Sequence, residues 1–282
     1  LRRRQRQMCI RDRPRRASFL VDADTIRALA EDGLSGLDAL ARVMYYLPPD
    51  LRKLARRYAL KAVLKLAPLS GAFRRRSRLT RVAGSWESDD IDVEATAERY
   101  LDNAPAPPEP VVVARGRGGE ALALIVDRSL SMSGFRIVAA TLAAATLAYA
   151  VPSDRLAVIA FNEEAEVIKG FGYTMFRDRL AEAVLSLEPQ GYTNFHAALS
   201  RAIKEFEAAG FSEARALLVT DGEWTVGPNP MPVASAFTRL DVVCVPGRWW
   251  RFAREMARRG GGRFFLLRGL EDLPRALSRV LV

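Results

Sequence analysis

The chain of 282 residues contains the stretch ALALIVDRSLS at residues 121–131. Its first six residues are all apolar, which is typical of a β-strand buried on both faces of a sheet. The run ends at Asp127, and two hydroxyl residues, Ser129 and Ser131, follow in the next loop. Because open α/β sheets carry their ligand sites at the carboxyl ends of parallel strands, this stretch predicts both a central strand and a polar site.

Two segments further along the chain repeat this arrangement. The apolar residues 216–219 lead into Asp221, and the loop at residues 191–194 brings Thr193 directly before a predicted helix. The candidate metal ligands are Asp127, Ser129, Ser131, Thr193 and Asp221. All five are oxygen ligands, which suit a hard divalent cation such as Mg²⁺, or Mn²⁺ in its place. Since only two of them are carboxylates, the bound ion would remain electron-poor and could accept a carboxylate from outside.

The Asp-x-Ser-x-Ser motif, followed in order by Thr193 and Asp221, resembles the metal-ion-dependent adhesion site of the von Willebrand factor A family. Every position of that motif is present, and the resemblance covers residues 111–282. Two residues depart from the usual pattern. Arg128 is a bulky charged residue inside the first loop, and Tyr192 stands where a second Gly is common before the Thr. Both departures bear on partner specificity more than on metal binding.

The resemblance implies a division of roles among the five ligands. Ser129, Ser131 and usually Thr193 contact the metal directly in this family. Asp127 and Asp221 hold it largely through water. The sixth position is left for an acidic residue of a partner protein, so the resemblance implies an interaction module with no catalytic residues.

The elements that follow Asp127 predict a doubly wound α/β domain with a mainly parallel, Rossmann-like sheet. Strands are predicted at 155–161, 165–168, 241–245 and 264–267, with the second forming a hairpin edge beside the first. Helices are predicted at 135–150, 176–187, 194–209, 250–259 and 270–281. Residues 111–114 are predicted to add an edge strand before the central one.

The chain divides at a proline-rich segment. Residues 105–110 read PAPPEP, which cannot continue a helix and predicts a stiff linker. We therefore expect a small helical region at residues 14–104, followed by the α/β domain at residues 111–282. The length and the 49% hydrophobic content are typical of a globular chain with a substantial core.

Residues 1–13 require separate treatment. From Arg3 to Arg13 they resemble, residue for residue, the translation of a transposase-based sequencing adapter, so we interpret them as an assembly artefact and exclude them from fold reasoning. This segment holds six Arg and one Asp and supplies half of the net charge of +10. The competing interpretation is a basic arm that binds nucleic acid. If the artefact is real, the natural start is missing, and a signal peptide or a further domain could precede it.

Basic residues gather before the linker. Residues 51–81 contain eleven Lys or Arg and no acid, whereas residues 87–109 contain eight acids and one Arg. Apolar residues from Leu51 to Leu66 follow helical spacing and leave Lys53, Arg56, Arg57 and Lys61 on the other side. The simplest interpretation is a solvated face that the acidic segment partly neutralises. The alternatives are that this helix binds an acidic partner, a membrane surface or RNA, and the last would make the chain an RNA-binding protein. We expect no DNA partner.

Enzymatic interpretations lack the necessary residues. The chain has a single histidine, His196, and no Gly-x-Ser-x-Gly motif that would mark a nucleophilic Ser for it to activate. It also has no Gly-rich phosphate-binding loop with the Lys that such a loop requires. A metal-dependent phosphoester hydrolase with Asp127 as nucleophile is the better enzymatic alternative. It lacks the second carboxylate two residues on, where Ser129 stands.

The order of the predicted domains leads to an expectation about the partner and the cellular location. Helices before a von Willebrand A domain are similar to prokaryotic CoxE-like proteins, which implies a MoxR-type AAA+ ATPase partner and a role in maturing or remodelling complexes. Trp224, three residues after Asp221, is a candidate interaction anchor, and packing is an equal alternative. With no disulfide framework and no apolar run of about 20 residues, we expect a cytoplasmic protein without a membrane span.

Overall fold

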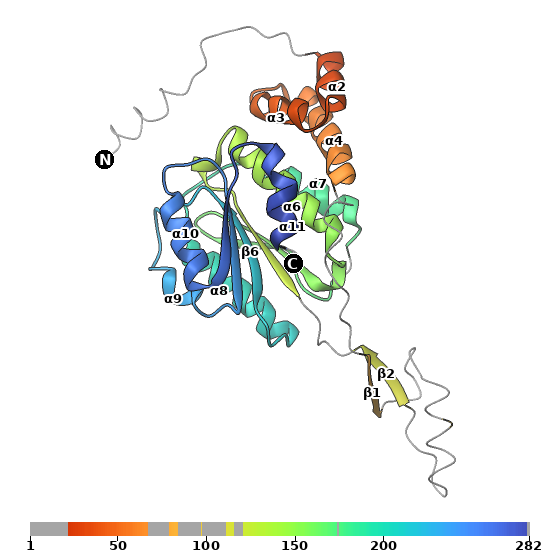
Figure 1. Cartoon of the computed structure of the whole chain (residues 1–282), viewed down its shortest axis with the longest axis vertical. Coiled ribbons are helices and arrows are strands. Elements are labelled where there is room, and N and C mark those ends of the chain that lie inside the picture. Colours follow the sequence, from red (N-terminus) through yellow and green to blue (C-terminus); the bar gives the residue numbers. More distant parts are fainter. Residues whose placement is uncertain are drawn as a thin grey trace, which may run out of the picture.

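The computed structural model describes residues 22–66, 79–83, 97, 111–115, 121–173 and 175–280. Its centre is a six-stranded sheet with the order β5-β4-β3-β6-β7-β8 (Figure 1). The strands are β3 (Leu122–Asp127), β4 (Leu156–Phe161), β5 (Ala165–Lys169), β6 (Arg215–Thr220), β7 (Arg239–Cys244) and β8 (Gly261–Leu266). All neighbours are parallel except β5, which pairs antiparallel with β4. The predicted hairpin edge is therefore confirmed.

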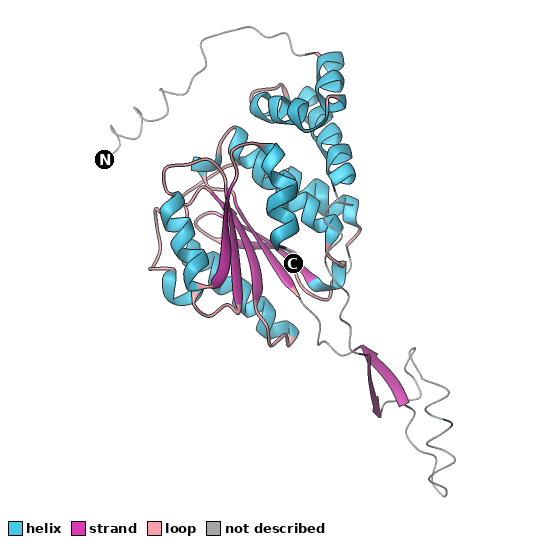
Figure 2. Ribbon diagram, viewed as in Figure 1, coloured by secondary structure: helices cyan, strands magenta, loops and turns pink. Residues whose placement is uncertain are grey.

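Helices cover both faces of this sheet (Figure 2). One face carries α6 (Phe135–Ala150), α7 (Arg177–Leu185) and α11 (Leu273–Val280), and the other carries α8 (Phe195–Ala209), α9 (Met231–Ala234) and α10 (Trp250–Arg259). Alternate residues of β3 supply the two cores: Leu124 packs with the first set of helices and Ile125 with the second. Because β3 is buried on both sides, its apolar run is continuous. The doubly wound α/β fold is confirmed.

The predicted edge strand at residues 111–114 does not join this sheet. Instead β2 (Val111–Arg115) pairs antiparallel with β1 (Leu79–Ala83), and the two form a separate ladder away from the main sheet (Figure 1). An apolar run predicts a strand but not its hydrogen-bonding partner, so the prediction of its place was wrong. The segments at 1–13 and 105–110 lie outside the described residues, and the proposed domain division remains a prediction.

Three helices precede the ladder and pack against the α/β domain. They are α2 (Ala23–Glu31), α3 (Gly33–Met44) and α4 (Pro49–Leu66). Helices α3 and α4 lie beside α6, α4 also contacts α7, and α2 packs on α3 and α4 (Figure 1). The fully buried Ile26 and Leu40 belong to the same hydrophobic core as α6. The Asp38 carboxylate accepts a hydrogen bond from the Leu270 backbone at 3.0 Å. The α/β domain and residues 22–66 therefore share one core in space.

Helix α6 is buried between the sheet and these N-terminal helices. Residues 137–148 are all buried, so the helix is apolar all round. Its two threonines satisfy their hydroxyls within the helix: Thr141 donates to the Ile137 carbonyl and Thr146 to the Leu142 carbonyl, both at 2.8 Å. No helix in the described part of the chain is long and apolar enough to cross a membrane.

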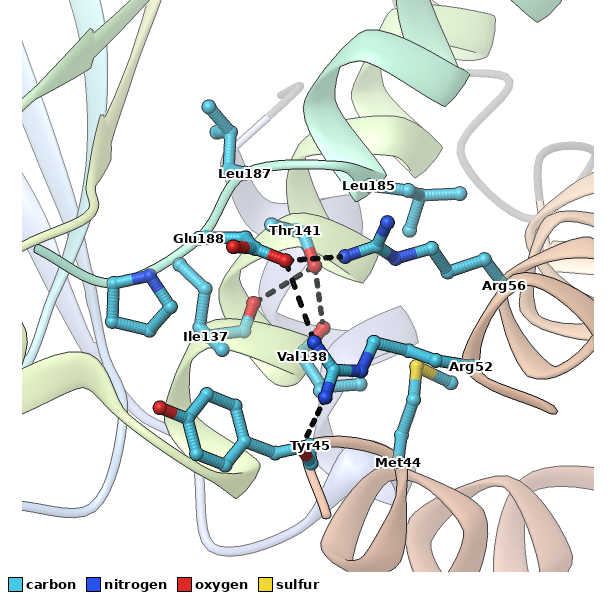
Figure 3. Close-up of a pocket in the computed structure, with 11 residues that line it drawn as sticks. Met44, Tyr45, Arg52, Arg56, Ile137, Val138, Thr141, Leu185, Leu187 and Glu188 are labelled. Atoms are coloured by element: carbon cyan, nitrogen blue, oxygen red, sulfur yellow. Dashed lines mark hydrogen bonds and ion pairs between the residues drawn. The ribbon is translucent and has the colours of Figure 1, made fainter. Parts of the chain in front are cut away.

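The basic face of α4 is not wholly solvated. Arg52 Nη1 and Arg56 Nη2 lie 3.4 and 3.7 Å from Glu188 Oε1, in the loop after α7 (Figure 3). Arg52 also donates to the carbonyls of Tyr45 and Leu47 at 3.0 and 3.1 Å. Tyr45, Arg52, Arg56 and Glu188 line a small pocket between α4 and α6. Lys53, Arg57 and Lys61 are exposed as expected, whereas Arg56 is only partly exposed. Helical spacing could not reveal its acidic neighbour in the α/β domain.

Candidate metal centre

The two predicted carboxylates lie side by side at one edge of the sheet. Asp127 is the last residue of β3, and Asp221 directly follows β6. These strands are parallel neighbours, with Val126 opposite Val219, so both carboxylates emerge at the same edge. The chain runs outward from β3 to β5 and returns at β6, which makes this the topological switch point of the sheet. Both residues are buried.

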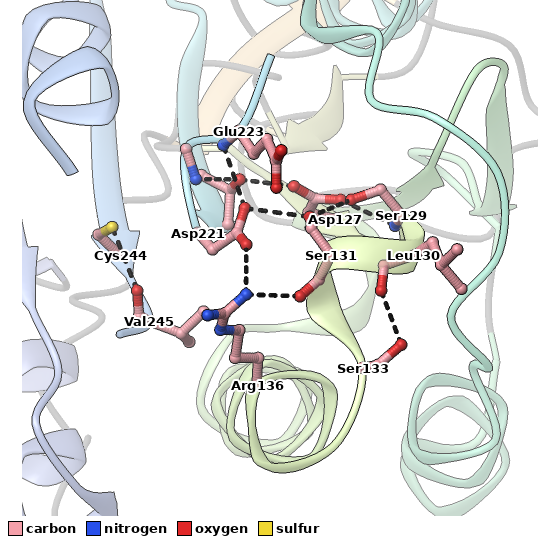
Figure 4. A network of polar contacts seen from close by, with 12 residues as sticks. Asp127, Ser129, Leu130, Ser131, Ser133, Arg136, Asp221, Glu223, Cys244 and Val245 are labelled. Carbon is pink, nitrogen blue, oxygen red and sulfur yellow. Dashed lines mark hydrogen bonds and ion pairs between the residues drawn. The ribbon is translucent and has the colours of Figure 1, made fainter. Parts of the chain in front are cut away.

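A continuous hydrogen-bond network joins four of the five predicted ligands (Figure 4). The Ser129 backbone N–H donates to Asp127 Oδ1 at 2.9 Å. The Ser129 and Ser131 hydroxyl oxygens are 3.1 Å apart, and Ser131 Oγ donates to Asp221 Oδ1 at 3.3 Å. The Ser129 backbone N–H and the two Ser hydroxyls thus connect the Asp127 and Asp221 carboxylates.

Thr193 is held nearby through its loop. Its N–H donates to Thr225 Oγ1 at 2.7 Å, which ties it to the segment after Asp221. The same loop is joined to the first one, because Leu130 N–H donates to the Gly191 carbonyl at 3.0 Å. Thr193 is buried, but its hydroxyl makes no hydrogen bond to the other four ligands among the described residues. The three predicted loops therefore meet, with Thr193 one step removed from the network.

Burial makes the Asp127 carboxylate unusual. Desolvation, and after it the neighbouring Asp221 carboxylate, raise the pKa of Asp127 to about 7. Hydrogen bonds from Ser129 and Thr220 act in the opposite direction. Thr220 Oγ1 donates to Asp127 Oδ2 at 2.5 Å and accepts from the Gly222 N–H at 2.9 Å. Two buried carboxylates at this proximity repel each other, and a cation between them would relieve that repulsion.

Sequence reasoning missed three residues of this site. Arg136, in the first turn of α6, donates from Nη1 to Asp221 Oδ2 at 3.0 Å and to the Ser131 carbonyl at 2.7 Å. Glu223 donates its backbone N–H to Asp221 Oδ1 at 3.1 Å. Burial, and then Asp221, raise the pKa of the Glu223 carboxyl. Thr220 is the third. The sequence signal that could have identified them is their position, since all three lie within five residues of a predicted ligand.

The donor set fits a hard cation and not a soft one. Among the described residues, no three His, Cys, Asp or Glu side chains come together as a metal cluster. A cation at this edge would therefore depend on the Ser hydroxyls as well as on Asp127 and Asp221, and oxygen-only ligation suits Mg²⁺ or Mn²⁺. His196 lies in the first turn of α8 and takes no part in the network.

The loop after β7 packs directly on Asp221. Gly222 has φ of +83°, and a Cβ at this position would lie 2.6 Å from the Trp249 carbonyl oxygen. A Cβ at Gly247 would lie 2.9 Å from the Asp221 carbonyl oxygen. Both close approaches require glycine. The start of α10 is thereby fixed beside the carboxylate.

Comparison with known proteins agrees with this geometry. Residues 122–223 match the family model for the von Willebrand factor type A domain. This stretch is similar to a von Willebrand factor type A domain. Domains of this type are generally non-enzymatic modules that mediate metal-dependent protein interactions. A search of curated proteins found no match to this chain.

Solved structures share the fold. A von Willebrand factor type A protein from Catenulispora acidiphila is 21% identical with a TM-score of 0.52, and the match covers 57% of this chain and 42% of that one. An aerotolerance-related membrane protein from Bacteroides fragilis is 18% identical with a TM-score of 0.49, covering 58% and 98%. Proximal thread matrix protein 1 from the mussel byssus, in a structure with a zinc-occupied MIDAS motif, is 13% identical with a TM-score of 0.47, covering 57% and 47%. This chain thus spans less than half of the Catenulispora protein.

Proposed function

We propose that the von Willebrand A domain of this chain captures an acidic residue of a partner protein through a bound Mg²⁺ or Mn²⁺ ion. The ligands would be Asp127, Ser129, Ser131, Thr193 and Asp221. The observation that carries the proposal is the continuous hydroxyl and carboxylate network from Asp127 to Asp221 at the switch point of the sheet. In this arrangement the hydroxyls of Ser129, Ser131 and Thr193 would hold the ion, and the two carboxylates would supply negative charge to balance it.

The charge of the site favours an acidic ligand. Asp127 and Asp221 together balance one divalent cation. Arg136 adds a further positive charge within hydrogen-bonding distance of Asp221. The carboxyl of Glu223, which lies beside Asp221, offsets the charge of Arg136, so only Asp127 and Asp221 are left to balance the ion. The ion would therefore not be over-neutralised and could accept an incoming Asp or Glu side chain of a partner.

Catalysis is not part of the proposal. The alternative phosphoester hydrolase needs Asp127 as an accessible nucleophile. Asp127 is fully buried, and both of its carboxylate oxygens accept hydrogen bonds, from the Ser129 N–H and from Thr220 Oγ1. A carboxylate engaged in this way is better suited to holding a cation than to attacking phosphorus.

The partner we favour is a MoxR-type AAA+ ATPase in the cytoplasm, as the resemblance to CoxE-like proteins implies. The helices α2 to α4 support this architecture, since they extend the domain on one side. The RNA-binding alternative is less well supported, because Arg52 and Arg56 of the basic helix are engaged with Glu188. Fold-level analogy remains the basis for the ATPase partner.

Metal binding is tested by isothermal titration of the purified chain with MnCl₂ and MgCl₂. Ser129→Ala and Asp221→Ala should each weaken binding at least about tenfold, since each removes a ligand or its charge. Ser133→Ala is the matched control. Ser133 lies in the same loop, but its hydroxyl donates to the Leu130 carbonyl at 2.6 Å and is not part of the ligand network (Figure 4). Unchanged binding in both ligand variants would remove the proposal.

Partner capture is tested separately. A native extract is passed over the immobilised chain with Mn²⁺ or with chelator, and the candidate AAA+ ATPase is then purified and added alone. We expect direct binding that chelator and Asp221→Ala both abolish. Retention of the same ATPase under all conditions would exclude metal-mediated capture.

A further inference from the structure

Large apolar side chains surround the candidate metal centre. Half of the eight large hydrophobic residues exposed in the described part of the chain belong to loops at this edge of the sheet: Leu130, Tyr192, Trp224 and Trp249. Each comes from a different loop. Trp249 is 54% exposed and Trp224 is 39% exposed. Exposed aromatic residues gathered at one site indicate a binding surface, since Trp and Tyr are enriched in interaction hot spots.

Both tryptophans come from segments next to Asp221, and the side chain of Trp224 is held by two contacts. Trp224 stacks on Phe252 of α10, with 5.5 Å between ring centroids and 13° between ring planes. Its Nε1–H also donates to the Val226 carbonyl at 2.8 Å. The Trp249 backbone lies against Gly222, the residue after Asp221, since a Cβ at Gly222 would lie 2.6 Å from the Trp249 carbonyl oxygen. A ligand bound at the metal would meet a preformed apolar surface on this side, which lowers the entropic cost of binding.

Unpaired positive charge continues from this surface along α10. Arg248, Arg251 and Arg254 are exposed and have no carboxylate partner in the described part of the chain. At the far end of the helix the situation differs, because Arg258 and Arg259 pair with Glu255 at 2.6 and 3.0 Å. Arg251 lies in the first turn of α10, where a basic residue opposes the helix dipole, so it does not stabilise the helix through its charge. Their charge is available to an external acidic group.

We propose that Trp224, Trp249, Arg248, Arg251 and Arg254, here called the α10 surface, bind the partner next to its metal-bound carboxylate. This inference rests on the proposed function and specifies the partner's chemistry. The bound segment of the partner carries one Asp or Glu for the metal, an apolar side chain that contacts the tryptophans, and further Asp or Glu residues that pair with the arginines. Charge complementarity and continuity with the metal centre select this occupant.

The test uses a bead library of twelve-residue peptides with a fixed central Asp and randomised flanks, screened against the full chain with Mn²⁺. Enriched peptides should carry an apolar residue and additional acids within a few positions of the central Asp. One enriched peptide is then synthesised with a fluorophore, and its affinity is measured by anisotropy. Chelator should abolish binding, as should replacement of the central Asp by Asn.

Variants separate the α10 surface from the metal centre. The pair Arg251→Glu and Arg254→Glu, and separately Trp249→Ser, should weaken the peptide at least about tenfold while Mn²⁺ affinity stays unchanged. Retained Mn²⁺ binding also shows that each variant is folded. The matched control is the pair Arg177→Glu and Arg179→Glu, which reverses the same charge on exposed positions of α7 and should have no effect.

The outcomes are distinguishable. Metal-dependent peptides that bind the variants as tightly as the parent would overturn the α10 surface and leave the proposed function standing. No metal-dependent enrichment at all would overturn both. Single-stranded RNA that binds without metal, and loses affinity in the Arg251→Glu and Arg254→Glu pair, would assign the surface to nucleic acid and overturn the acidic-peptide proposal.

Discussion

Arg136 and Asp221 form an ion pair at the candidate metal centre, with 3.0 Å between Nη1 and Oδ2. The same guanidinium nitrogen donates to the Ser131 carbonyl at 2.7 Å. One arginine at the start of α6 therefore connects the loop that carries Ser131 to the Asp221 carboxylate. The Asp221 side chain is 2% exposed, and this contact gives it a positive neighbour inside the protein.

Replacement of Arg136 should strengthen metal binding and weaken the fold. Arg136 and the cation compete for the negative charge of the Asp221 carboxylate, so in Arg136→Gln we expect up to about tenfold tighter Mn²⁺ binding. With chelator present, the free energy of unfolding should fall by about 1–3 kcal/mol, because a buried carboxylate loses its partner. Titration calorimetry and urea unfolding measure the two effects.

Arg201→Gln is the matched control for this experiment. It removes the same charge from a partly exposed ion pair with Glu205 on α8. Mn²⁺ affinity and the free energy of unfolding should therefore both change little. Weaker Mn²⁺ binding in Arg136→Gln would mean that Arg136 orients Asp221 for the metal instead of competing with it.

Metal affinity should rise with pH through about 7. Burial and Asp221 raise the pKa of Asp127 to about 7, so a proton competes with the cation below that pH. Without metal, the folded chain holds this proton more tightly than the unfolded chain between the ordinary value of 3.8 and about 7. The contribution of Asp127 to stability therefore falls as pH rises through that window, and bound metal opposes the loss.

The measurement is a series of Mn²⁺ titrations at pH 6, 7 and 8 in weakly coordinating buffers. The dissociation constant should decrease with pH and level off above about 8, one unit beyond the pKa. Thermal stabilisation by Mn²⁺ should likewise be larger at pH 8 than at pH 6. A dissociation constant that does not vary across this range contradicts the assignment.

Thr220 should matter for both stability and metal binding. Its hydroxyl donates to Asp127 Oδ2 and accepts from the Gly222 N–H, so Thr220→Val leaves two buried polar groups without a partner. We expect a loss of about 1–3 kcal/mol in the free energy of unfolding. The pH midpoint of Mn²⁺ binding should move upward, because the lost hydrogen bond favoured the charged form of Asp127.

Thr146→Val is the comparison for this variant. Thr146 is equally buried, but its hydroxyl donates only to the Leu142 carbonyl, which already serves its own helix. The loss in the free energy of unfolding should be smaller than for Thr220→Val, and Mn²⁺ binding should be unchanged. Equal losses in the two variants would show that Thr220 acts through packing alone.

The local pattern was sufficient for most of the fold. The apolar run before Asp127 predicted β3, and the Ala-rich segment predicted α6 with its observed bounds, Phe135–Ala150. Both elements are buried on all sides, so their own apolar residues are enough to identify them. The five candidate ligands could be chosen because each follows or begins a loop next to an apolar run, and the structure brings their three loops together.

Features that depend on tertiary pairing could not be predicted in the same way. The partner of Val111–Arg115 is Leu79–Ala83, a choice that strand propensity does not encode. Arg56 meets Glu188 across 132 positions of sequence, so helical spacing alone placed it in solvent. Arg136 escaped notice because a positive residue is not expected among metal ligands. Its role becomes visible only when α6 and β6 are seen to converge.

Residues 22–66 and the α/β domain should unfold together. Leu40 of α3 is fully buried in the core that includes α6, so Leu40→Ala should cost about 2–5 kcal/mol. The tryptophans at 224, 249 and 250 report on the α/β domain, and their fluorescence should show one urea transition, shifted to lower urea in the variant. Lys53→Ala, at an exposed position of α4, should leave the midpoint in place.

Two separate transitions, with the tryptophan signal unaffected by Leu40→Ala, would contradict this coupling. The alternative would then be a helical region that folds independently on the surface of the domain.

The double-sided burial of α6 has a practical consequence for dissecting the molecule. Its outer side is covered by α3 and α4, which come from the other side of the proline-rich segment in sequence. A fragment starting at residue 111 would expose a broad strip of alanine, leucine and valine to water. Such a fragment would self-associate or precipitate. Recombinant versions used for binding studies should therefore retain residues 22–66, or carry polar substitutions along that strip.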